Sequence, residues 1–232
     1  MQERTLLRIG AVWLIVGIVL FSLALFVGIA LIYGGPADSG DTRANLQAIA
    51  DSPLWMGVNL VGLAALLLFV GGLLALSRSI TKEPGAALAR LGFTAALLGG
   101  AFLSIQLVLE GSHTMKALAE ACAAAADKEV PCAVAEAMFL VSADFGSWGS
   151  VVFYGVAPIL FGLAIALTGL YPKWLGWVAV VGGVGAVSMG IVLFLQGLSV
   201  AGTIRFTAFG AVVTVSLLVM GVLMWRRAGA AA

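Results

Sequence analysis

The chain has few charged residues, and this shortage excludes most soluble classes of protein. Charged residues make up 10% of its 232 residues, hydrophobic residues make up 62%, and the mean hydropathy is +1.14. Such a composition is too apolar for a soluble domain. The chain has 12 Lys and Arg against 11 Asp and Glu, so its charge is nearly balanced. Nucleic-acid binding needs a concentrated basic surface, which this balance argues against. We therefore expect an integral membrane protein with the lipid bilayer, and no nucleic acid, as its partner.

Histidine and cysteine are also scarce, with one histidine and two cysteines. The single histidine, His113, excludes bis-histidine haem ligation. The sequence also lacks HExxH, a P-loop and the paired aspartates of an intramembrane protease. Cys122 and Cys132 share one polar segment without CxxC spacing. If that segment faces an oxidising compartment, the two cysteines are expected to form a disulfide, the alternative being two free buried thiols. These residues identify no particular cofactor.

Long apolar runs fill most of the chain. A hydrocarbon core of about 30 Å requires about 20 helical residues. The runs are continuous and lack the alternation of a membrane barrel strand. We therefore expect an all-α fold, a single domain over residues 1–232 built as a bundle of six transmembrane helices. The predicted spans are 9–32, 54–76, 88–109, 148–170, 174–196 and 206–225.

The distribution of Lys and Arg predicts how the bundle is oriented, because cytoplasmic flanks collect these residues. One set of flanks contains Arg4, Arg8, Arg78, Lys82, Arg90, Lys173, Arg226 and Arg227. The opposite flanks contain most of the acids, namely Asp38, Asp41, Asp51, Glu120, Asp127, Glu129 and Glu136, mixed with Arg43, Lys116, Lys128 and Arg205. The pattern predicts that both termini are cytoplasmic (N-in, C-in).

The segment between the third and fourth spans is predicted to be helical outside the membrane. Residues 116–126 and 134–144 are rich in Ala, Leu, Met and Glu, which are good helix formers. We expect both spans to extend as an extracytoplasmic helical hairpin that turns near residues 127–131. A short helix is also predicted over residues 43–50, and Pro158 is expected to kink the fourth span.

Polar residues at the outer ends of the spans form the candidate site. Gln106, Glu110 and His113 stand at positions i, i+4 and i+7, which places them on one helix face. Further candidates at the same depth are Asn59, Asp144, Ser147, Gln196 and Arg205. Ionisable residues beside a span often mark a functional site. The pattern predicts an outward-facing polar pocket, the alternative being that polar residues are simply tolerated at helix ends.

Several functions are compatible with this set of residues. We favour a non-catalytic protein that binds a small ligand or cation, or an accessory subunit for a membrane protein partner or a homo-oligomer. One alternative is a small proton- or cation-coupled transporter that uses Glu110, His113 and Asp144, with Arg205 as counter-ion. Another is a metal-assisted enzyme with Glu110 and His113 as ligands, although di-metal bundles use a second such pair. Serine chemistry at Ser147 is disfavoured because the spacing misses G-x-S-x-G.

One inner loop resembles a known sequence pattern. Residues 171–177 read Tyr-Pro-Lys-Trp-Leu-Gly-Trp and precede a Gly-Gly pair at 182–183. The stretch resembles an uncharacterised bacterial family of multi-spanning membrane proteins, a domain of unknown function. The similarity is best over the fourth to sixth spans, with a weaker match at residues 76–78. It implies a multi-pass protein of the bacterial cytoplasmic (inner) membrane and supplies no catalytic residues.

Overall fold

The computed structural model describes residues 2–32, 41–125, 129–196 and 200–230. Among these residues, six helical segments are long and apolar enough to cross a membrane, which confirms the predicted all-α bundle of a multi-pass membrane protein. The segments are α1 (Gln2–Ile32), α3 (Trp55–Ser79), α4 (Gly85–Glu110), the continuous run of α6 (Glu129–Ser150), η1 (Val151–Val156) and α7 (Ala157–Thr168), then α8 (Lys173–Gln196) and α9 (Val200–Ala230).

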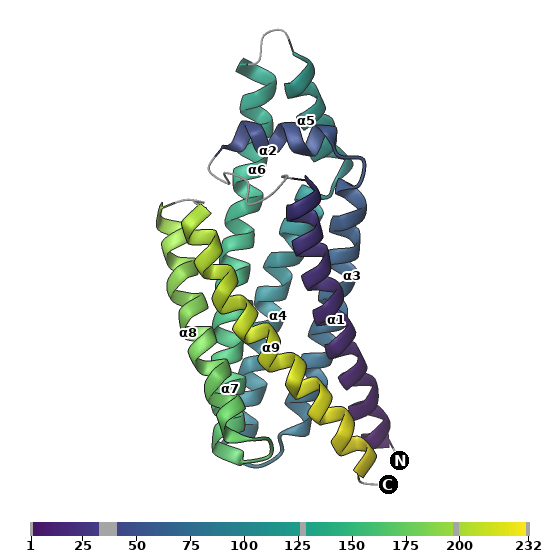
Figure 1. Ribbon diagram of the computed structural model, residues 1–232, viewed down its shortest axis with the longest axis vertical. Coiled ribbons are helices and arrows are strands. Elements are labelled where there is room, and N and C mark those ends of the chain that lie inside the picture. The colour runs from purple at the N-terminus through teal and green to yellow at the C-terminus, as the bar shows by residue number, and fades with distance from the viewer. Residues whose placement is uncertain (1, 33–40, 126–128, 197–199, 231–232) are drawn as a thin grey trace.

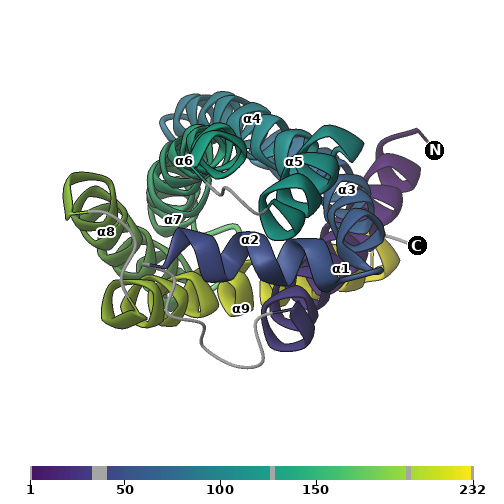
Figure 2. The ribbon, with the colours of Figure 1, turned by 90° about the horizontal axis from the view of Figure 1, so that it is seen from above.

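The spans close into a ring that follows chain order (Figure 2). Each packs on the next, from α1 and α3 through α4 to the α6–α7 run, and then through α8 to α9. Helix α9 crosses the bundle obliquely and returns to α1, so both termini lie at the same end (Figure 1). The loops that join α3 to α4 and α7 to α8 lie at this end as well. We call it the terminal end.

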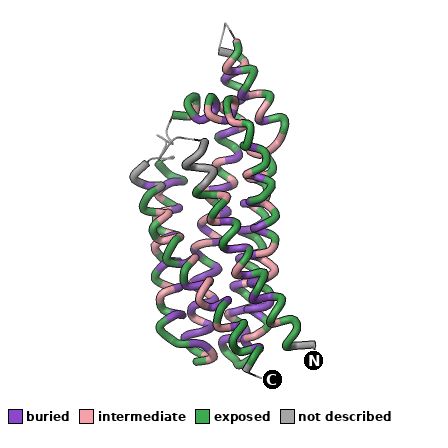
Figure 3. The backbone as a smooth tube through the Cα atoms, turned by 45° about the vertical axis from the view of Figure 1, so that its right-hand side comes forward, coloured by how far each residue is buried: buried purple, intermediate pink, exposed green. Residues whose placement is uncertain are grey.

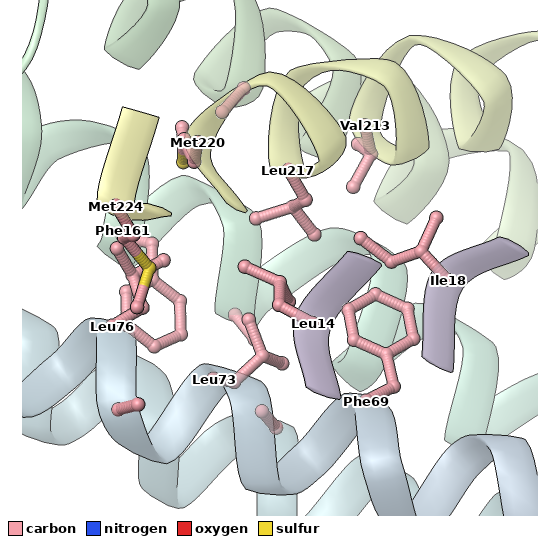
Figure 4. Close-up of a cluster of buried hydrophobic side chains, with 14 of the residues drawn as sticks. Leu14, Ile18, Phe69, Leu73, Leu76, Phe161, Val213, Leu217, Met220 and Met224 are labelled. Carbon is pink, nitrogen blue, oxygen red and sulfur yellow. The ribbon is translucent and has the colours of Figure 1, made fainter. Parts of the chain in front are cut away.

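Apolar side chains cover both the inside and the outside of the bundle. Figure 4 shows part of the core, where Leu14 of α1, Phe69 of α3 and Leu217 of α9 meet. Exposed residues recur along the outside of every span (Figure 3). Many of them are apolar too, with Leu60 at 68%, Leu67 at 63% and Leu195 at 74% exposure. A soluble protein would not expose so many large apolar side chains, whereas a bilayer accommodates them.

A π-helical turn precedes Pro158, where the sequence predicts a kink. Proline has no backbone N–H, and its ring crowds the carbonyl one turn earlier. The turn η1 ends at Val156, two residues before Pro158, and the Ala157 N–H donates to the Val152 carbonyl five residues back. This wider turn accommodates the proline without ending the helix. The predicted fourth span and one arm of the predicted hairpin are therefore a single helix.

Beyond the other end of the bundle, α2 (Thr42–Asp51) and α5 (His113–Ala124) pack with the first turns of α6 (Figure 1). We call α2, α5 and residues 129–142 the cap. Its small core packs on Trp55 of α3 and consists of Leu46, Ile49, Met115, Ala119, Cys122, Cys132, Ala135 and Phe139. The Cα atoms of Cys122 and Cys132 lie 4.6 Å apart, and the expected disulfide joins them.

The first arm of the hairpin in the cap is a separate helix, whereas the sequence predicted a continuation of the third span. Helix α4 ends at Glu110, and α5 is a new helix rather than an extension of the third span. Ser112 is the N-cap of α5, and its hydroxyl accepts a hydrogen bond from the Met115 N–H at 3.1 Å. The Gly111-Ser112 pair thus combines a helix stop with a helix start. Residues 126–128, part of the expected turn, lie outside the described residues.

Polar contacts tie α2 to the rest of the cap. The Lys116 ammonium donates to three backbone carbonyls at the end of α2, those of Ile49 at 3.0 Å, Ala50 at 2.7 Å and Ser52 at 2.9 Å. A cation is favourable at this position because the last carbonyls of a helix have no partner within it. The Arg43 Nε donates to Glu136 Oε1 at 2.6 Å, and this hydrogen bond raises the pKa of Arg43.

Candidate functional site

Glu110 is the centre of a polar cluster between α4 and α6. Its Oε1 accepts hydrogen bonds from Gln106 Nε2 at 3.0 Å and from the Ser142 hydroxyl at 3.1 Å. Gly146 leaves room for the Gln106 side chain, because a Cβ at that position would collide with the amide. The structure therefore brings together two of the predicted residues, Gln106 and Glu110, and adds Ser142.

Helix α3 meets the same turn through its first residues. The Trp55 indole N–H donates to the Glu110 carbonyl at 2.6 Å. Asn59 is buried one turn further along α3 and donates to the Trp55 carbonyl at 3.0 Å. The Asn59 side chain also lies against Gly111. Asn59 thus lies beside the end of α4, but the hydrogen bond of its amide is made within α3.

The other predicted residues lie apart from this cluster. His113 is exposed at the start of α5, so the helical spacing that placed it on one face with Glu110 ends at the Gly111-Ser112 break. Gln196 and Arg205 are exposed near the ends of α8 and α9, and Ser147 is half-buried in α6. Within the part of the chain that the structure describes, His113, Asp144 and Arg205 form no ion pair.

The arrangement does not fit the metal site considered from the sequence. Glu110 and His113 belong to different helices, and His113 is exposed. Across residues 2–32, 41–125, 129–196 and 200–230, no group of three or more His, Cys, Asp or Glu side chains could hold a metal ion. A catalytic zinc ion usually has three protein ligands. These residues therefore supply too few ligands for that chemistry.

Asp144 lies in an open cavity of about 350 Å³ between α4, α6 and α8. We call this cavity the aromatic pocket, and it is lined by Phe102, Val141, Asp144, Phe145, Trp148 and Phe194. The rings of Trp148 and Phe194 have centroids 5.0 Å apart. Those of Phe102 and Phe145 are 6.0 Å apart. Within this lining, the exposed carboxylate of Asp144 is the one charged group.

The polar cluster and the aromatic pocket occupy the same seam between α4 and α6. Phe102, Gln106 and Glu110 follow one another at four-residue spacing along α4, which puts them on one face. On α6 they meet Phe145, Gly146 and Ser142 respectively. The pocket begins beside Glu110, because Val141 and Asp144 flank Ser142 on α6, and it extends to Phe102, about two helical turns or about 12 Å further along α4.

Sequence reasoning missed several members of this site. Ser142 stands within a predicted helix, and a lone serine there has no distinctive pattern. Phe102 and Phe194 look like ordinary lipid-facing residues within their spans. A signal did exist on α6, because Asp144, Phe145 and Trp148 combine a carboxylate with two rings at positions i, i+1 and i+4. This spacing places Asp144 and Trp148 on one helix face.

No family model, curated protein or solved structure matches the chain. The resemblance of residues 171–177 therefore stays a prediction, but these residues have a clear structural role. Tyr171 is buried between α7 and α8, its hydroxyl lies 3.2 Å from the Ser79 hydroxyl, and burial raises its pKa. Leu175 and Gly176 are buried at the start of α8. The loop thus fastens α8 to the end of α3.

Proposed function

We propose that this chain is a non-catalytic, multi-pass membrane protein that binds a small organic cation in the aromatic pocket. The observation that carries the proposal is Asp144, a carboxylate without an ionic partner among the described residues, in a cavity lined by four aromatic rings. The rings come from three different helices, so the cavity depends on the folded bundle.

The lining favours an organic cation over an inorganic one. Aromatic faces attract cations through their ring quadrupoles, and quaternary ammonium groups are often bound in this way. Calcium and magnesium instead require several oxygen ligands, and Asp144 supplies the one carboxylate in this lining. An ammonium group beside Asp144, with its apolar body among the rings, would satisfy both kinds of residue.

The orientation of the bundle supports binding from outside the cell. The fold gathers Arg4, Arg78, Lys173 and Arg226 at the terminal end, away from the cap. Cytoplasmic flanks are enriched in such residues, so we place the terminal end in the cytoplasm and the cap outside. The pocket then lies in the outer part of the bundle. The resemblance of residues 171–177 supports a bacterial inner membrane as its location.

A matched pair of probes tests the proposed site. Benzyltrimethylammonium carries a charge that its carbon isostere, neopentylbenzene, lacks. We expect the purified protein in nanodiscs to bind the cation and to quench Trp148 fluorescence, with the quenching lost in Trp148→Phe. Asp144→Asn should weaken binding about tenfold, as expected when a charged partner worth about 1.4 kcal/mol is lost.

The control is Glu120→Gln, which removes an exposed carboxylate from the cap and should leave binding unchanged. Equal binding of the charged and neutral probes would overturn the proposal, as would equal losses in the two carboxylate variants. Cation uptake into liposomes that Glu110→Gln abolishes would replace it with the transporter hypothesis.

A further inference from the structure

A second cavity lies at the terminal end, between α1 and α9. It has a volume of about 200 Å³ and is lined by Arg8, Ile9, Val12, Trp13 and Trp225. We call it the arginine groove. Trp13 is 44% exposed and Trp225 is 48% exposed, so both indoles face outward from the bundle. The groove is therefore open on the side where lipid surrounds the protein.

Packing fixes the wall of the groove. Trp13 lies over Gly71 of α3, where any larger residue would collide with the indole ring. Trp225 comes from α9, which crosses onto α1 at this end. Tryptophan is common at membrane interfaces, but here two indoles from different helices flank one cavity with an arginine in its lining. The groove thus combines an apolar wall with a positive charge.

The surroundings of the groove are strongly basic. Arg4 lies one turn before Arg8 on α1, and Arg226 directly follows Trp225 on α9. Helix α9 contains no Asp or Glu along its described length. Arg4, Arg8 and Arg226 are exposed and form no ion pair with the described residues. The charge at this groove is therefore available to an anion from outside the chain.

We propose that the arginine groove binds one anionic phospholipid, with the headgroup phosphate at Arg8 and an acyl chain against Trp13 and Trp225. Basic pockets between transmembrane helices recognise such headgroups, and arginine suits phosphate because its fork donates two parallel hydrogen bonds. A soluble phosphate would leave the apolar wall unused. A zwitterionic lipid also carries a phosphate, but its choline cation would add a positive charge beside Arg4 and Arg226, so an anionic headgroup is favoured.

Native mass spectrometry tests this directly. The intact protein is purified in detergent with equal amounts of phosphatidylglycerol and phosphatidylcholine of identical acyl chains. We expect one phosphatidylglycerol to be retained in preference to phosphatidylcholine. Arg8→Gln should reduce that retention about fivefold, the effect of one basic residue near a lipid surface. Lys173→Gln, an exposed cation on α8 at the same end, should leave retention unchanged.

Three results would overturn the assignment. These are equal retention of the two lipids, equal effects of Arg8→Gln and Lys173→Gln, or displacement of the lipid by millimolar glycerol phosphate. Displacement would identify a soluble phosphate site instead. Trp13→Leu gives an independent check, because it keeps every charge and should still weaken retention of phosphatidylglycerol.

Discussion

Asp144 and Glu110 are two carboxylates with different surroundings. Glu110 accepts hydrogen bonds from Gln106 and Ser142 and joins α4 to α6. Asp144 is exposed beside aromatic rings and has no ionic partner among the described residues. We infer that Glu110 stabilises the bundle, whereas Asp144 is available to a ligand.

This difference predicts opposite effects on stability. Glu110→Ala leaves the Gln106 amide without its acceptor and removes the Ser142 contact between α4 and α6, which should cost about 1–3 kcal/mol. The Ser142 hydroxyl keeps the Phe139 carbonyl as an acceptor at 2.7 Å. Asp144→Asn should change stability by less than about 0.5 kcal/mol, as exposed substitutions usually do. Thermal unfolding of both variants in the same detergent would measure the difference. Equal unfolding temperatures would contradict a structural role for Glu110.

For single residues, the sequence indicates which side chains could form a site better than it indicates which of them are in contact. Glu110 and Gln106 could be paired because both belong to one regular helix. His113 could not be placed, because the break at Gly111-Ser112 changes the helix direction before it. The contact between Ser142 and Glu110 could not be predicted, because the two residues are 32 positions apart in the sequence. Contacts between helices depend on how each helix is rotated, which apolar runs alone do not fix.

Among the elements, the cap is held together by more than its disulfide. Lys116 bonds the last carbonyls of α2, and Arg43 pairs with Glu136 on α6. The structure also gives Lys116 an ion pair with Glu120 at 3.6 Å. Lys116 is largely buried, with a side-chain exposure of 15%, whereas Glu120 is exposed at 56%. The carbonyl bonds are therefore the stronger part of this arrangement.

We expect Lys116→Met to loosen α2, because its last carbonyls lose a charged donor. Hydrogen exchange of the α2 amides should become about tenfold faster or more, as the loss of charged hydrogen bonds worth about 1.5–3 kcal/mol requires. Glu120→Gln, which keeps Lys116 and its carbonyl bonds, is the control and should exchange like the wild type. An equal acceleration in both variants would assign the effect to the ion pair instead.

Helix existence was predictable, but some helix ends were not. The spans follow from the length of the apolar runs, and α2 follows from its helix formers, with Asp41 as its N-cap. The stop at Gly111 had a signal in the Gly-Ser pair, which good helix formers on either side outweighed. Pro158 indicated a disturbance, but its accommodation by a π-helical turn depends on how η1 packs against α4 and α8.

The whole molecule separates its charges between two ends. Both termini and the basic loops lie at the terminal end, and the cap with its disulfide lies at the other. This separation makes the orientation testable with single cysteines, because the native cysteines are paired and do not compete for a thiol reagent. Thr114 on α5 and Lys173 on α8 are exposed and lie at opposite ends.

An impermeant maleimide should label the Thr114→Cys variant in intact cells. Bacterial outer membranes, where present, are opened beforehand with a permeabilising peptide that spares the inner membrane. The Lys173→Cys variant should react only after lysis, because positive flanks favour the cytoplasm. The reverse pattern would invert the predicted orientation and place the aromatic pocket toward the cytoplasm.

The cap also imposes an order on how the chain assembles in the cell. Helix α2 comes before the spans α3 and α4, and α5 follows them, yet α2 and α5 pack together. They can meet only after both intervening spans have crossed the membrane. Until then, Leu46 and Ile49 of α2 have no α5 to cover them. An open cap therefore marks a chain in which α3 and α4 have not both been inserted, and the cap can close before α8 and α9, which come later in the chain, are in place.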